Sequence, residues 1–282
     1  KSASGGDYTR GLKADARCFI DISTLVDIAS TTLSLSIFQP ENLLREARRQ
    51  KSIPDCEVPP VCVLDPDGDL AEYLLANGRA VKNECWACYH SSLYNFELNG
   101  MKIGIVPCAV GAPYAVLVAE QLFVSGCRLL ISVTSAGIIC PPAHHKRFAL
   151  IVEAVRDEGT SYHYLPPEAP SRLAESLCQK LLPSAEQPDC PFFGATSWTT
   201  DAPYRETPSA IASMQTLGVT CVEMEAAALY AFAAAKEKPV VCFAHITNSM
   251  AQTEGDFEKG EAFGSIDTLN LLTIIIAQLY QK

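Results

Sequence analysis

Two carboxylates stand inside an apolar run of this sequence. Glu223 and Glu225 flank Met224 in CVEMEAAALYAFAAAK, residues 221–236, where the other side chains are mostly alanine or larger apolar groups. Burying a carboxylate without a partner is costly. Each glutamate therefore needs a structural role, such as capping a helix or pairing with an arginine, or a ligand whose hydroxyl groups donate hydrogen bonds to it. From the residues alone, both interpretations stay open.

The sequence around these glutamates alternates between short apolar runs and helical patterns. The apolar runs predict strands at 61–65, 101–110, 127–137, 149–156, 192–198, 219–224 and 239–248. The helical patterns predict helices at 69–78, 113–126, 171–182, 225–236 and 265–281. Strands that are apolar throughout and separated by helices are typical of a sheet covered on both faces. We therefore predict an α/β fold: a single domain with a central mixed, largely parallel sheet flanked by helices in three α/β/α layers.

Ligands of such sheets bind outside the carboxyl ends of the strands. Four polar segments follow predicted strands: VTSAG (133–137), WTTDAPYRE (198–206), EME (223–225) and ITNS (246–249). We expect them to meet at one edge of the sheet and to form the site there.

Composition limits the classes of partner. The 282 residues carry a net charge of −10 and a pI near 5.0, which argues against a nucleic-acid surface but not against a small anionic ligand. Residues 22–38 come closest to a membrane span, but they contain Asp27 and many hydroxyls. We expect a cytoplasmic protein without a membrane partner. Residues 1–57 read as an N-terminal extension with a helix at 38–51, and residues 58–282 as the domain.

The 12 cysteines mostly lie in apolar runs, as buried free thiols do. Cys85 and Cys88 form a C-x-x-C pair with no second pair at zinc-site spacing, so a redox or metal role is not favoured. His144 and His145 read as a solvated loop pair. We expect no metal and no organic cofactor.

Several motifs together resemble the nucleoside phosphorylase family, which includes uridine phosphorylase, hexameric purine nucleoside phosphorylase and methylthioadenosine nucleosidase. The motifs are GVTCVEMEAAALYA followed by VVCFAHITN, the segment 97–139 around IGIVPCAVGAPYA and LLISVTSAGII, the segment GATSWTTDAPYRE, and VCVLDPDGDLAEYLL. They occur in the family's order, and the resemblance covers roughly residues 58–282. NSMAQTE, residues 248–254, is nearest to the uridine phosphorylase branch.

The resemblance implies a ribose site. Glu225 would bind the 2′- and 3′-hydroxyls, Met224 would pack on the sugar, and Glu223 would support the same edge. His90 would reach the site of a neighbouring subunit, which implies a homo-oligomer, either a dimer or a hexamer. A surface histidine without such a role is the alternative for His90.

The resemblance also implies a base site and an anion side. Tyr204, Arg205 and Asn248 would contact the base, with Arg205, Asn248 and Glu225 as the catalytic residues. Gly68, Asp67, Thr134 and Ser135 would line the side where phosphate or water attacks. In purine-specific members of the family, an aspartate at the position of Asn248 delivers a proton to the departing base. Asparagine cannot deliver a proton, so the resemblance favours a pyrimidine or 6-oxopurine nucleoside.

This sequence lacks the arginines that the family uses to hold phosphate. Ala71 and Ser132 stand at two of those positions, and Asp67 and Asp69 add negative charge to the first loop. Phosphate is usually held by arginine forks or helix N-termini, and an acidic loop repels it.

Three functions therefore remain open for a protein that binds a small-molecule nucleoside. The first is phosphorolysis of the N-glycosidic bond, uridine-phosphorylase-like, with phosphate as co-substrate held by groups such as Arg79 or Arg147. The second is hydrolysis by a nucleosidase, with Asp67 or Asp69 orienting the water. The third is nucleoside binding without catalysis.

Overall fold

The computed structural model describes residues 36–141, 145–249 and 254–280. The strands are β1 (Val61–Asp65), β2 (Ala80–Lys82), β3 (Tyr94–Leu98), β4 (Met101–Pro107), β5 (Leu129–Ile138), β6 (Phe148–Asp157), β7 (Ser171–Arg172), β8 (Phe192–Thr200), β9 (Cys221–Glu223) and β10 (Val240–Asn248). The α-helices are α2 (Pro40–Lys51), α3 (Asp69–Ala76), α4 (Ala112–Val124), α5 (Glu175–Ala185), α6 (Pro208–Thr216), α7 (Ala226–Lys236) and α8 (Ser265–Leu279). Short 3-10 turns are η2 (Ser161–His163), η3 (Pro203–Arg205) and η4 (Glu261–Gly264).

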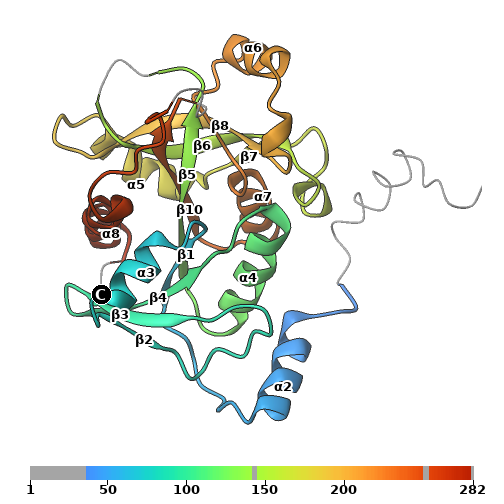
Figure 1. Ribbon diagram of the computed structural model, residues 1–282. Helices are drawn as coiled ribbons and strands as arrows, with labels where there is room; N and C mark the ends of the chain where they lie inside the picture. The colour runs from blue at the N-terminus through green and yellow to red at the C-terminus, as the bar shows by residue number, and fades with distance from the viewer. Residues whose placement is uncertain (1–35, 142–144, 250–253, 281–282) are drawn as a thin grey trace, which may run out of the picture.

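These elements form the expected α/β fold. Figure 1 shows α4 and α7 on one side of the central strands β1, β5 and β10, and α3 and α8 on the other. The sheet is mixed, as predicted, but it is not largely parallel. Among the described strands, five pairings are parallel and five are antiparallel. The parallel prediction holds for the centre, where β4, β1, β5 and β10 are neighbours.

Strand β5 lies at the centre of the sheet and pairs with three other strands. It pairs with β1 and β10 in parallel and with β9 antiparallel, and β10 continues through β6 and β8 back to β9. Its first six residues are all buried. Antiparallel pairing to β9 was not readable from the sequence, because β9 is only three residues long.

Helix α7 is buried on all sides, which explains its alanine-rich sequence. All eight residues from Ala226 to Ala233 are buried. Small side chains let the helix lie close to the strands and to α4. Tyr230 is the large exception: its hydroxyl donates to the carbonyl of Ile151 at 2.5 Å and accepts from the N–H of Cys242 at 3.0 Å.

The predicted helix at 38–51 is confirmed as α2, whereas residues 1–35 lie outside the described part of the chain. Leu44 and Ala47 of α2 pack with Ala87. A disulfide joins Cys56, just after α2, to Cys85. The C-x-x-C pair is therefore not a bonded pair, because Cys88 keeps a free, buried thiol.

Several elements differ from the predictions. The polar strands β2 and β3 and the helix α6 were not predicted, because they lack the apolar runs used as a signal. The predicted helix 171–182 begins only at Glu175, since Ser171 and Arg172 pair with β6. By length and composition, Glu261–Leu279 could cross a membrane, but nearly half of it is buried inside the molecule, as in core helices.

Candidate active site

The carboxyl ends of the central strands meet at one edge, as predicted. Because β1, β5 and β10 are mutually parallel neighbours, Asp65, Ser135 and Asn248 emerge on the same side of the sheet. Glu223 ends β9 beside this edge, since Val222 pairs with Gly137 of β5. The pairing of these strands thus brings together the expected segments VTSAG, EME and ITNS.

Glu223 is a structural carboxylate in this arrangement. One oxygen accepts hydrogen bonds from the N–H groups of Glu225 and Ala226, at 2.8 and 2.7 Å, at the start of α7. The other oxygen accepts from the hydroxyls of Ser197, at 3.0 Å, and Thr199. Burial raises the pKa of Glu223, and these four donors oppose that rise. Its role as a helix cap leaves it no oxygen to offer a sugar.

Glu225 differs from Glu223 because half of its carboxyl group has no partner. It is only 2% exposed, and its Oε1 accepts from the N–H of Gly111 at 2.7 Å. Its Oε2 is buried and lacks a hydrogen-bond partner within the described part of the chain. Burial, and then the neighbouring Glu223, raise the pKa of Glu225 to about 8, while the N–H of Gly111 and the nearby hydroxyl of Thr134 oppose that rise. A buried polar atom without a partner needs an explanation, and a ligand hydroxyl that donates to it is one.

Met224 and His90 are the two other residues predicted at the ribose. Met224 is next to Glu225 in sequence, and His90 is linked to the turn around Gly111 through Tyr114. Met224 is partly exposed between the two glutamates. The backbone carbonyl of His90 accepts from the hydroxyl of Tyr114 at 2.7 Å, and Tyr114 lies in the first turn of α4, three residues after Gly111. The side chain of His90 is exposed.

Charged groups of the chain itself fill the predicted anion side. Oδ2 of Asp67 accepts from the backbone N–H of Ser135 at 3.0 Å and from the Ser135 hydroxyl. The ammonium of Lys259 lies 3.3 Å from that same oxygen and also pairs with Asp69. Gly68 turns the loop at φ 85°, and a Cβ there would lie 2.9 Å from Sγ of Cys108.

A small cavity lies against these groups. It has a volume of about 20 Å³ and is lined in part by Asp65, Asp67, Thr134, His245 and Lys259. That is enough for about one water molecule.

Two buried titratable residues at this cavity were missed by the sequence analysis. Asp65 accepts from the N–H of Ala71 at 2.9 Å, and burial raises its pKa to about 7. His245 stacks on Phe148, and its Nε2 is buried with no hydrogen-bond partner in the described residues. Burial, and then the charge of Arg147, lower the pKa of His245 to about 4, so the ring is neutral at pH 7.

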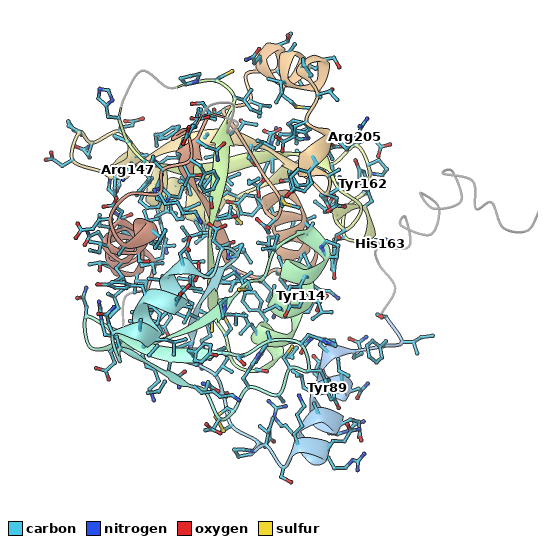
Figure 2. The ribbon with its side chains drawn as sticks, viewed as in Figure 1. Tyr89, Tyr114, Arg147, Tyr162, His163 and Arg205 are labelled. Carbon is cyan, nitrogen blue, oxygen red and sulfur yellow. A yellow bond between two sulfur atoms is a disulfide. The ribbon has the colours of Figure 1, made fainter. Side chains whose placement is uncertain are left out.

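The residues predicted at the base are spread out in the single chain. Tyr204 is 99% exposed, and Arg205 is also exposed, both in η3 after β8. Figure 2 shows Arg205 in the loop between β8 and α6. Asn248 is partly buried at the end of β10, where its amide donates to the hydroxyl of Thr247 at 3.1 Å. The predicted base side is therefore open, unlike the predicted sugar side.

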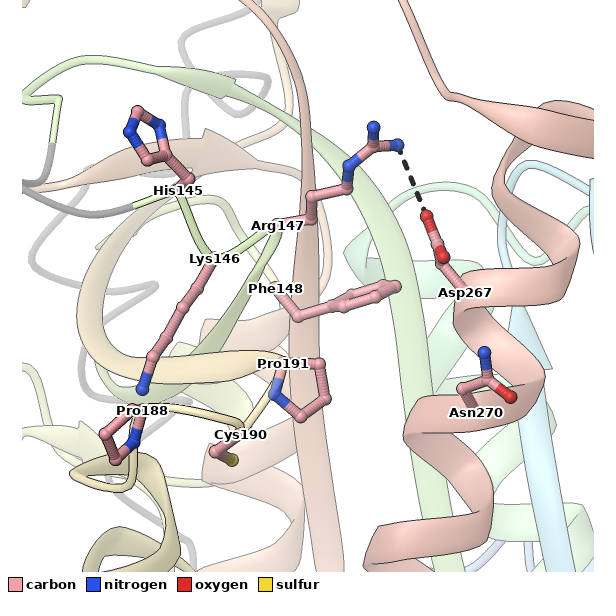
Figure 3. Close-up of a pocket in the computed structure, with 9 residues that line it drawn as sticks. All are labelled: His145, Lys146, Arg147, Phe148, Pro188, Cys190, Pro191, Asp267 and Asn270. Atoms are coloured by element: carbon pink, nitrogen blue, oxygen red, sulfur yellow. Dashed lines mark hydrogen bonds and ion pairs between the residues drawn. The ribbon is translucent and has the colours of Figure 1, made fainter.

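Neither of the arginines suggested as phosphate ligands lines the small cavity. Arg79 follows the C-terminal end of α3, whereas Asp67 precedes the N-terminal end of the same helix. Arg147 pairs with Asp267 of α8, with Nη1 and Oδ2 3.2 Å apart, and lines a separate cavity of about 600 Å³ (Figure 3). Phe148 also lines that cavity and stacks on His245, so the two cavities are neighbours.

Some of the site residues that the sequence analysis missed had a signal in the sequence, and others had none. Gly111 sits in a Gly-Ala-Pro turn before a predicted helix, and Asp65 belongs to the acidic loop, so both had a signal. Lys259 and His245 had none, because a lysine in a polar segment and a histidine in an apolar strand are ordinary in sequence. No group of three or more His, Cys, Asp or Glu side chains in the described residues is arranged to hold a metal ion.

The fold and this site define an α/β protein with a buried carboxyl site at the strand ends. The chain belongs to the phosphorylase superfamily, whose family model matches residues 60–277. The resemblance to nucleoside phosphorylases is thereby confirmed.

Two curated relatives are DeoD-type purine nucleoside phosphorylases of Streptococcus pyogenes serotype M12, strains MGAS2096 and MGAS9429. Each is 27% identical over 143 residues, which cover 50% of this chain and 60% of the relative. This chain thus matches about 60% of the length of those relatives.

Solved structures share the fold. A purine nucleoside phosphorylase from Toxoplasma gondii, in complex with immucillin-H, has a TM-score of 0.65 at 17% identity and covers 79% of this chain and 90% of its own. A uridine phosphorylase from Vibrio fischeri ES114, complexed with 6-hydroxy-1-naphthoic acid, has a TM-score of 0.65 at 19% identity, with coverages of 79% and 93%. Purine and uridine enzymes are both among these neighbours, so the uridine branch remains a prediction.

Proposed function

We propose that this protein cleaves the N-glycosidic bond of a nucleoside, with the ribose held by Glu225. The observation that supports this most directly is the buried, unpartnered Oε2 of Glu225 at the strand-end edge. A ribose diol supplies the hydroxyl donors that this oxygen lacks. Membership of the phosphorylase superfamily supports the same substrate class.

The reaction would pass through an oxocarbenium-like transition state. Positive charge develops on the ribose while the base departs with negative charge. Glu225 would hold the sugar hydroxyls and, once ionised, favour the sugar cation. Arg205 and Asn248 would stabilise the base. Each such donor is commonly worth about 3 kcal/mol of transition-state stabilisation. Because Asn248 cannot deliver a proton, a pyrimidine or 6-oxopurine is the favoured base.

Phosphorolysis is the form of the reaction that the family and the named relatives support. One observation favours hydrolysis as the second candidate. The cavity beside Asp67 holds about 20 Å³, and the Ser135 donors are engaged by a carboxylate rather than free for phosphate. In that case Asp67 or Asp69 would orient an attacking water.

The base side supports a homo-oligomer. Tyr204 and Arg205 are exposed in the single chain, and so is the side chain of His90. A neighbouring subunit, in a dimer or a hexamer, would close the open base side and receive His90. The proposed reaction needs no metal and no organic cofactor; phosphate is its only candidate co-substrate. The cytoplasmic location also remains a proposal.

The experiment that tests this function is a chromatographic assay of base release over a panel of nucleosides, with phosphate-free protein. Base release that requires added phosphate identifies a phosphorylase. Equal base release without phosphate identifies a nucleosidase. No release of any base, even though a nucleoside raises the melting temperature, would identify a binding protein and overturn the proposed catalysis.

A further inference from the structure

Three hydrogen-bond donors converge on one oxygen at the end of β5. They are the N–H of Ser135, the hydroxyl of Ser135 and the ammonium of Lys259, and we call them the oxyanion cradle. A backbone N–H, a hydroxyl and a cation directed at a single point are the groups that bind an oxyanion. In this structure the oxyanion is Oδ2 of Asp67.

Lys259 is fixed in this cradle. Its side chain is only 15% exposed and pairs with Asp69 as well as Asp67. Burial lowers the pKa of Lys259, but the two carboxylates outweigh burial and raise it, so the group is a permanent cation at neutral pH. It reaches the cradle from the segment before η4, 190 residues after Asp69 in sequence.

Asp67 is held less firmly than its partners. Its side chain is 32% exposed, and its contacts with Ser135 and Lys259 all involve the one carboxylate oxygen in the cradle. Rotation of this side chain towards solvent would leave the three donors free. Until that happens, an external oxyanion must displace a carboxylate that is already in place.

We propose that Asp67 is a built-in ligand of the oxyanion cradle and that it determines which nucleophile the site accepts. While Asp67 occupies the cradle, inorganic phosphate is excluded and only a water molecule fits beside it. Removing the carboxylate opens the cradle to phosphate, with Lys259 as the cation that binds it. This inference deepens the proposed function, because the cradle lies on the side from which the nucleophile would attack.

The test measures phosphate binding without any nucleoside, by equilibrium dialysis of labelled inorganic phosphate against the full chain. Asp67→Ala is expected to tighten the Kd for phosphate at least tenfold relative to the unmodified protein. Asp67→Asn, which keeps the shape and removes the charge, is the second variant if the alanine variant unfolds. Glu72→Ala is the matched control, since it removes one negative charge from the exposed face of α3 and leaves the cradle intact.

A double variant assigns the cation. Asp67→Ala with Lys259→Met is expected to lose the gained phosphate affinity. The proposal is overturned if Asp67→Ala and Asp67→Asn, both folded by circular dichroism, bind phosphate no more tightly than Glu72→Ala. It is also overturned if the double variant binds as tightly as Asp67→Ala. Because these readouts need no turnover, tight phosphate binding by Asp67→Ala, together with no cleavage of any nucleoside by the unmodified protein, would refute the proposed function alone.

Discussion

The carboxyl group of Glu225 accepts a hydrogen bond from the backbone N–H of Gly111 at 2.7 Å, across 114 residues of sequence. The bond joins the junction of β9 and α7 to the turn that starts α4. It leaves the second carboxyl oxygen of Glu225 buried and unpartnered in the described structure. A fold that needed Glu225 only for packing would have satisfied both oxygens, as it does for Glu223.

The two glutamates are therefore expected to respond differently to substitution. Glu225→Ala should lower kcat/KM for nucleoside cleavage by about 100-fold or more, because it removes the sugar's partner in the transition state. The melting temperature should change less than in Glu223→Ala, since the carboxyl group of Glu225 has two donors nearby, the N–H of Gly111 and the hydroxyl of Thr134, whereas that of Glu223 has four. Steady-state kinetics with thermal unfolding measure both. Glu237→Gln, an exposed glutamate just after α7, is the control.

Glu223→Ala should instead destabilise the fold. It leaves two N–H groups of α7 and two buried hydroxyls without their acceptor, which costs about 1–3 kcal/mol for each group left unsatisfied. Urea unfolding measures the loss. A Glu223→Ala protein as stable as the unmodified one would contradict the capping role.

Stability should fall as pH rises from 7 to 8. Glu225 has a folded pKa of about 8, above its unfolded value, so the folded state holds a proton that the unfolded state has lost. Each such proton lowers the free energy of unfolding by at most about 1.4 kcal/mol per pH unit. Asp65, with a pKa of about 7, and His245, with a pKa of about 4, titrate mainly below this window. Urea unfolding at several pH values should show the slope in the unmodified protein and its loss in Glu225→Gln.

Lys259→Met should destabilise the protein by about 1–3 kcal/mol at neutral pH, because it leaves two partly buried carboxylates close together without their cation. The folded pKa of Lys259 is raised, so its contribution is complete below the unfolded pKa and disappears only at strongly alkaline pH. Lys259→Arg keeps the charge and should retain most of the stability. If Lys259→Met and Lys259→Arg lose the same free energy of unfolding, the positive charge of Lys259 does not contribute to stability.

Loss of the Cys56–Cys85 disulfide should lower the free energy of unfolding by about 3–4 kcal/mol in the chain-entropy model, given the separation of 29 residues. Cys56→Ser and added reductant should give the same loss. Cys178→Ser, at a free and partly exposed thiol, is the control. If Cys56→Ser and Cys178→Ser are equally stable, the disulfide does not form in solution.

The sequence by itself determined the main strands and helices of the domain. Runs such as VCVLD and PVVCFAHITN have no polar face, so they are stable only as strands covered on both sides. The positions of Gly68, Ser135 and Asn248 at strand ends followed from the same pattern. Glu223 and Glu225 were singled out together because carboxylates in an apolar run demand an explanation, and the family resemblance then assigned the sugar to Glu225.

Only the tertiary structure decided which of the two glutamates keeps a carboxyl oxygen without a hydrogen-bond partner among the described residues, and which groups fill the predicted anion side. Glu223 and Glu225 look equivalent in sequence, and the donors that distinguish them come from β8, α7 and the turn before α4. Lys259 lies 192 residues from Asp67, and nothing in its local sequence marks it as a partner of that aspartate. Hydrogen bonds and ion pairs act over a few ångströms, so the groups that decide this chemistry are those that folding brings together from distant parts of the chain.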